Sequence, residues 1–166
     1  MKKKIINSNN IIISINKQVK NQYFVEEILE AGLILQGWEV KSLRSGKVDI
    51  SSSYVYLHDN NAYLFSAHFQ PLLSSSPNLM LDPLRNRNLL LKKKEYNYLY
   101  EKVKRQGYTL IAYSLYWKNN WCKLQIALAK GKKKYDKRAL IKEREWLIKK
   151  NRILKQEKRD ILKNKV

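Results

Sequence analysis

The sequence predicts a mainly β domain, a small closed antiparallel barrel with helices packed on it, followed by a long basic tail. Three observations lead to this fold class. Short segments rich in β-branched and aromatic residues alternate with turn residues along the first 130 positions, and one amphipathic segment interrupts them. After position 130 the chain has one Gly, no Pro and many Lys and Arg. The 166 residues therefore divide into a flexible N-terminus (1–10), a β-barrel body (11–130) and a helix-capable basic tail (131–166).

The first elements of the body are strands. Residues 11–15 and 23–29 are rich in Ile, Val, Tyr and Phe, which favour a pleated, half-buried surface. Residues 33–36 continue the same sheet. A short helix is predicted over 38–44, because its apolar residues stand three apart and the following Gly46 is suited to end it.

Two hairpins follow from the turn residues. Residues 54–57 and 62–65 flank the run Asp-Asn-Asn, and residues 110–117 and 121–129 flank the run Lys-Asn-Asn. Asn and Asp tolerate the left-handed backbone conformation that tight hairpin turns require. The second pair of segments also alternates apolar and polar side chains. The sequence therefore predicts two antiparallel hairpins.

One amphipathic helix separates the two hairpins. Its apolar side chains recur at helical spacing and are Tyr96, Leu99, Tyr100 and Val103. Gly107 ends the segment. Upstream, Asp82 followed by Pro83 has helix-start chemistry, because the Asp oxygen can cap the first amides and Pro needs no hydrogen bond at the first position. At least five short strands with two helices between them are typical of a barrel of the oligonucleotide-binding type.

The charge of the chain favours a polyanionic partner. The sequence holds 34 Lys+Arg against 14 Asp+Glu, a formal charge of +20, and residues 130–166 alone carry a net +11. Self-repulsion of this size disfavours compaction unless an anion offsets it. In the tail, Leu140, Leu147, Leu154 and Ile161 recur every seven residues, but charged residues occupy the second half of each repeat. We therefore expect the tail to be disordered when free and to become ordered against a polyanion.

The sequence lacks the motifs that are typical of several classes of enzyme and metal-binding protein. The sequence has no phosphate-binding glycine loop, no H-E-x-x-H and no paired Cys, and His58 and His68 stand apart from other ligand types. We therefore expect no catalytic residues, no metal, no cofactor and no small-molecule substrate. Cys122 alternates in phase with core residues, which predicts a buried thiol, and a single Cys fits a reducing cytoplasm. No apolar stretch approaches the ~20 residues that span a membrane.

Two basic segments are candidates for contact with RNA. The run from Lys130 to Arg138 combines phosphate-seeking charges with a flexible Gly and one aromatic side chain that can stack on a base, which favours RNA contact. The lysines and arginine of the amphipathic helix are less specific. For these residues, solvation and RNA contact remain equally open.

These residues belong to a longer set of motifs. They include Asn16-Lys17, then Glu30-Ala31-Gly32, then G-W-E-V-K-S-L-R from Gly37 to Arg44 with Gly46 and Lys47, then D-P-x-R-x-R-x-L-L-L from Asp82 to Leu91, and A-K-G-K-K-x-x-D-K-R from Ala129 to Arg138. In this order and spacing, over about residues 15–150, the sequence resembles the SsrA-binding protein family, also called small protein B. Only the two ends of the chain are unmatched.

The resemblance implies both a fold and a function. The fold is a closed oligonucleotide-binding barrel with packed helices. The function is to bind transfer-messenger RNA and deliver it to bacterial ribosomes stalled on broken messages, which enables trans-translation without chemistry by the protein itself. On this resemblance, Glu30, Leu90 and Lys123 match positions that form or support the surface gripping the tRNA-like end of that RNA. Asn16 matches a position in the same patch.

The resemblance also implies a role for the tail. It resembles the segment that enters the empty messenger channel of the ribosome, at the decoding centre, and folds into a helix there. The matching residues that open this segment are Gly131, Lys132, Lys133, Tyr135, Asp136, Lys137 and Arg138. Tyr135 stands where His is common in the family, so an aromatic face survives but a titratable group does not. Asn21 also replaces a common His.

Three other functions are weighed against this one. A ribosomal or general single-stranded-RNA protein on the same barrel would share the composition, and only the motifs separate the two. A nuclease or RNA-modifying enzyme would need clustered carboxylates or a His/Lys constellation, which the sequence does not offer. Attachment to a membrane through the tail would need bulky apolar residues on one face, where Trp146 is nearly alone.

Overall fold

The computed structural model describes residues 10–72 and 81–163. The chain divides into two compact units, Met1–Gly131 and Lys132–Val166, which we call the body and the tail. None of the helices within the described ranges is long and apolar enough to cross a membrane.

The body contains nine strands and three helices in the part of the chain that is described. In chain order they are β1 (Ile11–Ile15), α1 (Val19–Gln22), β2 (Tyr23–Leu33), α2 (Gly37–Arg44), β3 (Val48–Asp49), β4 (Tyr54–His58), β5 (Asn61–Phe65), β6 (His68–Phe69), β7 (Arg87–Leu90), α3 (Lys93–Gln106), β8 (Thr109–Lys118) and β9 (Trp121–Gly131). The tail holds α4 (Lys134–Lys163).

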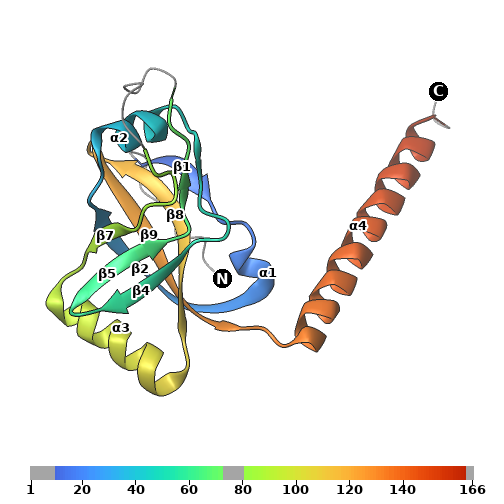
Figure 1. Ribbon diagram of the computed structural model, residues 1–166. Coiled ribbons are helices and arrows are strands. Elements are labelled where there is room, and N and C mark those ends of the chain that lie inside the picture. The colour runs from blue at the N-terminus through green and yellow to red at the C-terminus, as the bar shows by residue number, and fades with distance from the viewer. Residues whose placement is uncertain (1–9, 73–80, 164–166) are drawn as a thin grey trace. The chain divides into compact units, whose positions relative to one another are not determined.

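Six strands of the body pair in a ring. Antiparallel ladders join β8 to β4, β4 to β5, β5 to β7, β7 to β2, β2 to β9, and β9 back to β8. The link between β4 and β8 is the narrowest, with Tyr54 opposite Ile111 as its single pair. Strand β1 extends the sheet beyond β8, and β3 pairs with β6 in a small separate sheet. Helices α2 and α3 lie at opposite ends of the ring (Figure 1). The architecture is mainly β with helices, as predicted.

The core fills the inside of the ring with alternate side chains of the strands. On β9, Leu124, Ile126 and Leu128 are completely buried, and Leu64 and Leu115 meet them from β5 and β8. Helix α3 covers one end of this core, because its Leu99 and Tyr96 are buried. Cys122 is a core residue, and burial raises the pKa of its thiol to about 12. The predicted buried thiol is confirmed.

The turn residues behave as the sequence predicts. Asp59 and Asn60 have φ of 45° and 60°, and Asn119 and Asn120 have φ of 47° and 65°. Both pairs therefore adopt the left-handed conformation that brings two strands together in a tight hairpin. The hairpins β4–β5 and β8–β9 and the short helix α2 are confirmed.

The amphipathic helix is confirmed, but its expected start is wrong. Helix α3 begins at Lys93, where Glu95 accepts a hydrogen bond from the backbone N–H of Lys92, and it ends at Gly107 in the left-handed conformation. Asp82 instead accepts the N–H of Leu84 and closes a single turn. A helix cannot grow from that turn, because Arg87–Leu90 form β7 and pair with β5 and β2. Long-range pairing overrides the local start signal.

A buried cluster of charges holds the end of the ring that α2 covers. The Glu39 carboxylate and the Arg87 guanidinium are both fully buried, with Arg87 Nε 2.8 Å from Glu39 Oε1. Arg85 reaches the other oxygen, Nη2 to Oε2, at 2.7 Å. The backbone N–H of Gln36 also donates to Glu39 Oε2 at 2.7 Å. One carboxylate of α2 therefore holds the start of its own helix and both arginines near β7.

The remaining donors of Arg87 are also satisfied. Its guanidinium donates to the backbone carbonyls of Ala67 and Arg85, both at 2.7 Å, and to that of Pro83 at 3.0 Å. The guanidinium carbon lies 3.8 Å from the centre of the Phe69 ring. A buried cation is tolerated when its charge and all its donors are paired. The two arginines of the D-P-x-R-x-R motif therefore act in the fold.

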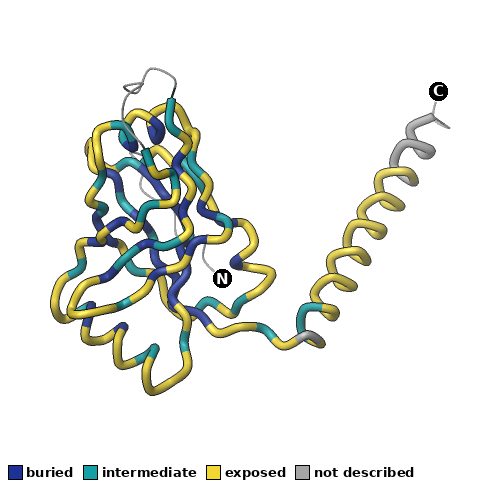
Figure 2. Tube along the Cα trace, viewed as in Figure 1, coloured by how far each residue is buried: buried dark blue, intermediate teal, exposed yellow. Residues whose placement is uncertain are grey.

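The tail was predicted to be helix-capable and to be disordered when free, and its disorder in the free protein stays a prediction. Residues Lys134–Lys163 form one continuous helix, α4. The reason is local propensity, because the segment has no Gly or Pro and is rich in Lys, Arg, Glu and Leu. Most of the α4 tube is coloured as exposed in Figure 2. Among its described side chains, the apolar Leu140, Leu147 and Leu154 are exposed. An isolated helix of this kind is marginal in water.

The buried ion pair leads to the first prediction. Glu39→Gln keeps the shape of the side chain but leaves Arg87 as a buried charge without a counter-ion. We expect the free energy of unfolding to fall by about 3–5 kcal/mol in urea denaturation. The matched control is Glu101→Gln, which removes the exposed Arg105–Glu101 pair on α3 and should change stability by less than about 0.5 kcal/mol. Equal effects of the two substitutions would contradict a structural role for the buried cluster.

Candidate nucleic-acid interface

Three neighbouring strands bring Glu30, Leu90 and Lys123 onto one outer face of the ring. Gly32 of β2 lies opposite Leu90 of β7 on one side and opposite Lys123 of β9 on the other. Glu30 stands two residues before Gly32 on the same strand and therefore points to the same side. The structure thus brings together three of the four body residues selected from the sequence. We call this surface the Glu30 face.

Gly32 lets the chain pack closely at the centre of the Glu30 face. A Cβ atom at this position would lie 3.3 Å from Leu90 Cβ and 3.4 Å from Leu90 Cδ1. A larger residue would therefore push Leu90 outward. Leu90 is 59% exposed, so it presents an apolar surface beside the charged groups of the face.

The Glu30 carboxylate, which we call the hub of this face, contacts three other side chains. The Tyr116 hydroxyl donates to Glu30 Oε2 at 2.5 Å, and Lys118 Nζ lies 3.1 Å from the same oxygen. Lys123 Nζ lies 3.7 Å from Oε1. Partial burial raises the pKa of Glu30, but the hydrogen bonds from Tyr116 and Lys118 and the charges of both lysines outweigh it, so the pKa falls below its ordinary value. The carboxylate stays ionised and orients two ammonium groups.

Two members of the Glu30 face were not found from the sequence. Tyr116 and Lys118 lie on β8, far from Glu30 in the chain, and reach it across the sheet. Burial and the hydrogen bond to Glu30 raise the pKa of Tyr116 above its ordinary value, so it remains a donor. The alternation of side chains along the strand could have identified them. Both residues alternate with the core residues Leu115 and Trp117 and must therefore point outward.

Asn16, the fourth selected body residue, lies elsewhere. It follows β1 and is only 2% exposed. Its amide donates to the backbone carbonyls of Ile50 and Ser51, at 3.2 and 3.0 Å, and its oxygen accepts the N–H of Gln18. These bonds fix the turn into α1. In this structure Asn16 therefore supports neighbouring residues and offers little surface of its own.

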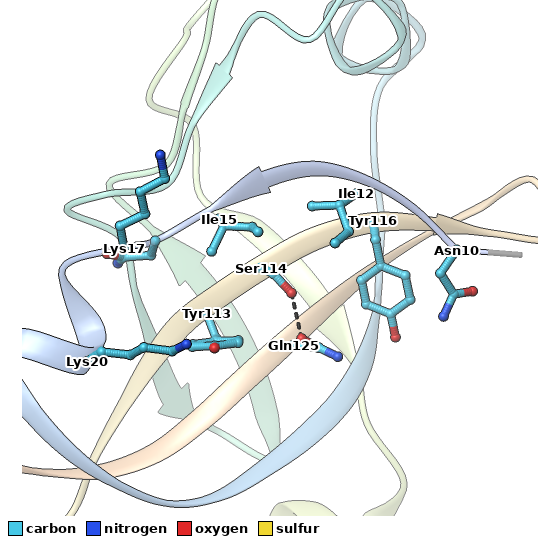
Figure 3. Close-up of a pocket in the computed structure, with 10 residues that line it drawn as sticks. Asn10, Ile12, Ile15, Lys17, Lys20, Tyr113, Ser114, Tyr116 and Gln125 are labelled. Atoms are coloured by element: carbon cyan, nitrogen blue, oxygen red, sulfur yellow. Dashed lines mark hydrogen bonds between the residues drawn. The ribbon is translucent and has the colours of Figure 1, made fainter. Parts of the chain in front are cut away.

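A cavity of about 210 Å³ adjoins the Glu30 face. It lies between β1, the start of α1, β8 and β9, and Tyr116 is common to both (Figure 3). The lining residues are Asn10, Ile12, Ile15, Asn16, Lys17, Lys20, Tyr113, Ser114, Tyr116 and Gln125. Gln125 stands directly opposite Glu30 in the β2–β9 ladder, so the cavity and the Glu30 face form one continuous surface.

The other carboxylates of β2 hold α3. The Tyr98 hydroxyl donates to Glu27, and Tyr108 donates to Glu26, which also pairs with Lys102. The hydrogen bond from Tyr108 is the main reason that the pKa of Glu26 is lowered. Lys102 is therefore engaged within the body.

The residues that open the tail lie at the start of α4. Gly131 ends β9, and Lys132 and Lys133 connect it to the helix. Asp136 accepts the backbone N–H of Lys133 at 3.2 Å and so satisfies one of the unpaired amides of the first turn. Tyr135, Lys137 and Arg138 occupy the same turns, and Tyr135 is exposed. The tail thus begins with a capped helix and an exposed aromatic ring among cations.

No group of three or more potential metal ligands exists among the residues that the structure describes.

Comparison with known proteins agrees with these features. The family model described as SmpB protein matches residues 13–156. A chain of the solved structure described as "tmRNA-SmpB: a journey to the center of the bacterial ribosome" is 38% identical, with a TM-score of 0.60, over 73% of this chain and 85% of that chain. Both findings confirm the resemblance to small protein B that the motifs indicated. The chain therefore belongs to the SmpB protein family.

Proposed function

We propose that this protein binds transfer-messenger RNA and delivers it to stalled bacterial ribosomes, where it enables trans-translation. The observation that carries the proposal is the match of residues 13–156 to the SmpB family, together with the 38% identical chain from a tmRNA-SmpB structure on the bacterial ribosome. The formal charge of +20 suits two RNA partners. Sequencing the RNA that the protein retains from a bacterial lysate tests this. One enriched tRNA-like RNA supports it, and a broad spread of messages favours a general RNA-binding protein.

In this proposal the Glu30 face binds the tRNA-like domain of the RNA. Lys118 and Lys123 are held in place by the Glu30 carboxylate and supply phosphate contacts, while Leu90 supplies apolar contact. The negative charge of Glu30 does not repel RNA as a bare carboxylate would, because two ammonium groups surround it. Asn16 acts as a positioning residue through the backbone it holds.

The tail has a separate role in this proposal. It enters the messenger channel of the ribosome, where the phosphates neutralise its charge and stabilise α4 as a helix. Support comes from a helix whose described apolar side chains include exposed ones and whose first two turns carry Tyr135, Lys137 and Arg138. Tyr135 provides a stacking surface near the decoding centre.

The proposal also covers the barrel type, the absence of catalysis and the cellular location. The ring order of the strands, with α3 preceding the β8–β9 hairpin, supports a closed barrel of the oligonucleotide-binding type. The protein acts as a binding adaptor without catalysis of its own. Because its partner is the ribosome, it acts in the cytoplasm.

Lys123→Ala tests the phosphate contact. We expect binding of the tRNA-like RNA to weaken and the slope of log K against log salt to become shallower by about 0.9 or less, which is one phosphate contact. Gel-shift titrations at several salt concentrations measure both quantities. The matched control is Lys41→Ala, an exposed lysine on α2 to which no RNA contact is assigned. Unchanged affinity with a lowered melting temperature would reverse the assignment.

Glu30→Gln tests the hub. The amide keeps the shape of the carboxylate but no longer attracts Lys118 and Lys123, so we expect the fold to persist and RNA binding to weaken by roughly tenfold, since hydrogen bonds to charged groups contribute about 1.5–3 kcal/mol. Circular dichroism and gel shifts separate the two effects, with Glu101→Gln as the control. Tighter binding by Glu30→Gln would mean that the carboxylate only repels RNA.

Truncation after Arg138 tests whether the body and the tail have separate functions. The body contains the apolar core and should fold alone. The truncated protein should therefore bind transfer-messenger RNA with an affinity within several-fold of that of the full chain. It should fail to support tagging in a reconstituted reaction on a stalled ribosome. Normal tagging would reduce the tail to an electrostatic anchor, and loss of RNA binding would show that the body alone is not the recognition module.

A further inference from the structure

The cavity beside the Glu30 face has walls suited to a flat ring. Ile12 and Ile15 of β1 lie on one side, and each remains at least 42% exposed although its strand is part of the sheet. Tyr113 and Tyr116 of β8 lie on the other side (Figure 3). Cross-strand pairing places Ile12 beside Tyr116 and Ile15 beside Ser114, so the aliphatic and aromatic groups adjoin on one face of the sheet. The Tyr116 ring is held by its hydrogen bond to Glu30, so this wall is fixed before any ligand enters.

The floor of the cavity carries an oriented amide. The Ser114 hydroxyl, which is almost completely buried, donates to Gln125 Oε1 at 2.6 Å. In this orientation the amide nitrogen, which carries two N–H donors, forms the other end of the group. Figure 3 shows this nitrogen on the side away from Ser114, toward Tyr116. None of the hydrogen bonds described for Gln125 uses these donors, so they can reach an acceptor on a ligand.

The rim is cationic. Lys17 and Lys20 are the only charged residues among the ten that line the cavity, and no carboxylate is among them. In Figure 3 Lys17 extends from the turn after β1 and Lys20 from α1, both on the side of the cavity at which α1 begins. An anionic group would therefore be attracted to this end, while the apolar and amide groups occupy the other.

From these features we propose that the cavity receives one unpaired nucleobase, with the attached phosphate held by Lys17 and Lys20. Aromatic and aliphatic walls accept the faces of a base, and the Gln125 amide donates to a carbonyl or ring nitrogen on its edge. The volume of about 210 Å³ lies below that of most small-molecule pockets, which suits a single base and excludes a base pair. The inference rests on the proposed binding of RNA by the Glu30 face and extends that face by a pocket for an extruded base.

A nucleotide titration tests the pocket without the natural RNA. The 15N-labelled full-length protein is titrated with AMP, GMP, CMP and UMP, and with ribose 5-phosphate as the ligand that lacks a base. We expect at least one nucleotide to shift the resonances of Tyr113, Ser114 and Gln125 with millimolar saturation, and ribose 5-phosphate to leave them unmoved. Equal shifts with ribose 5-phosphate would leave only a phosphate site, and no shifts would leave no site. Either result overturns the proposal.

Two pocket variants sharpen this test. Gln125→Glu replaces the donors by acceptors at nearly constant volume, and Tyr113→Leu removes one aromatic wall. Each should weaken the nucleotide affinity about tenfold, whereas Tyr56→Leu, an exposed tyrosine on β4 outside the cavity, should not. The urea midpoint of each variant is measured alongside. Gln125→Glu keeps the test decisive if Tyr113→Leu fails to fold. Native affinity in a folded Gln125→Glu protein would contradict recognition by the amide.

A protein–RNA double-mutant cycle connects the pocket to the natural ligand. Each unpaired nucleotide of the tRNA-like domain is made abasic in turn. We expect one abasic RNA to bind the native protein about tenfold more weakly than the intact RNA does. Its affinity for the Tyr113→Leu variant should be little lower still, whereas the effects of the abasic site and of Tyr56→Leu on the binding free energy should add. Additivity of every abasic site with Tyr113→Leu would overturn the proposal. If the native protein does not bind this RNA at all, the proposed function fails, and the nucleotide titration still decides the pocket.

Discussion

The arrangement of the body depends on one buried carboxylate, that of Glu39. It accepts hydrogen bonds from the guanidinium groups of Arg85 and Arg87 and from the backbone amide of Gln36, just before its own helix, so α2 and β7 are held in one geometry. Strand β7 in turn closes the ring between β5 and β2 and sets Leu90 over Gly32. A charge buried at this depth is costly unless every donor is matched, which makes the geometry all-or-none. The surface that we propose for RNA binding is thus built on a buried ion pair.

The carboxylates of this basic chain are used to place cations and hydroxyls. Glu39 does so inside the body, Glu30 on the Glu30 face, and Glu26 and Glu27 at the contact between β2 and α3. Each acid accepts from a tyrosine, an arginine or a lysine that approaches from another element. Excess positive charge repels itself, and a few acidic side chains at the contacts between elements hold the cationic groups in fixed positions. The Lys118 and Lys123 ammonium groups are the clearest example.

The sequence predicted the parts of the fold that local chemistry controls. Asn and Asp in the turns, the apolar phase of β8 and β9, and the glycine after α3 each act over a few residues, and all are confirmed. The start expected at Asp82 was wrong because β7 pairs with strands distant in the chain. For the same reason Tyr116 and Lys118 were missed, since only the folded sheet shows that they reach Glu30. Asn16 matched a motif, but a motif does not tell a surface contact from a buried support.

The state of the single thiol has a practical consequence. Cys122 is 8% exposed, its pKa is about 12, and the sequence contains no other cysteine. A maleimide reacts with a thiolate, so the native protein is close to inert toward such reagents at neutral pH. A cysteine introduced at any exposed position would then be the one reactive site, with Cys122 left in place. Fluorophores could be attached to body and tail without redesigning the core, and energy transfer between them would test whether the ribosome takes up the tail as proposed.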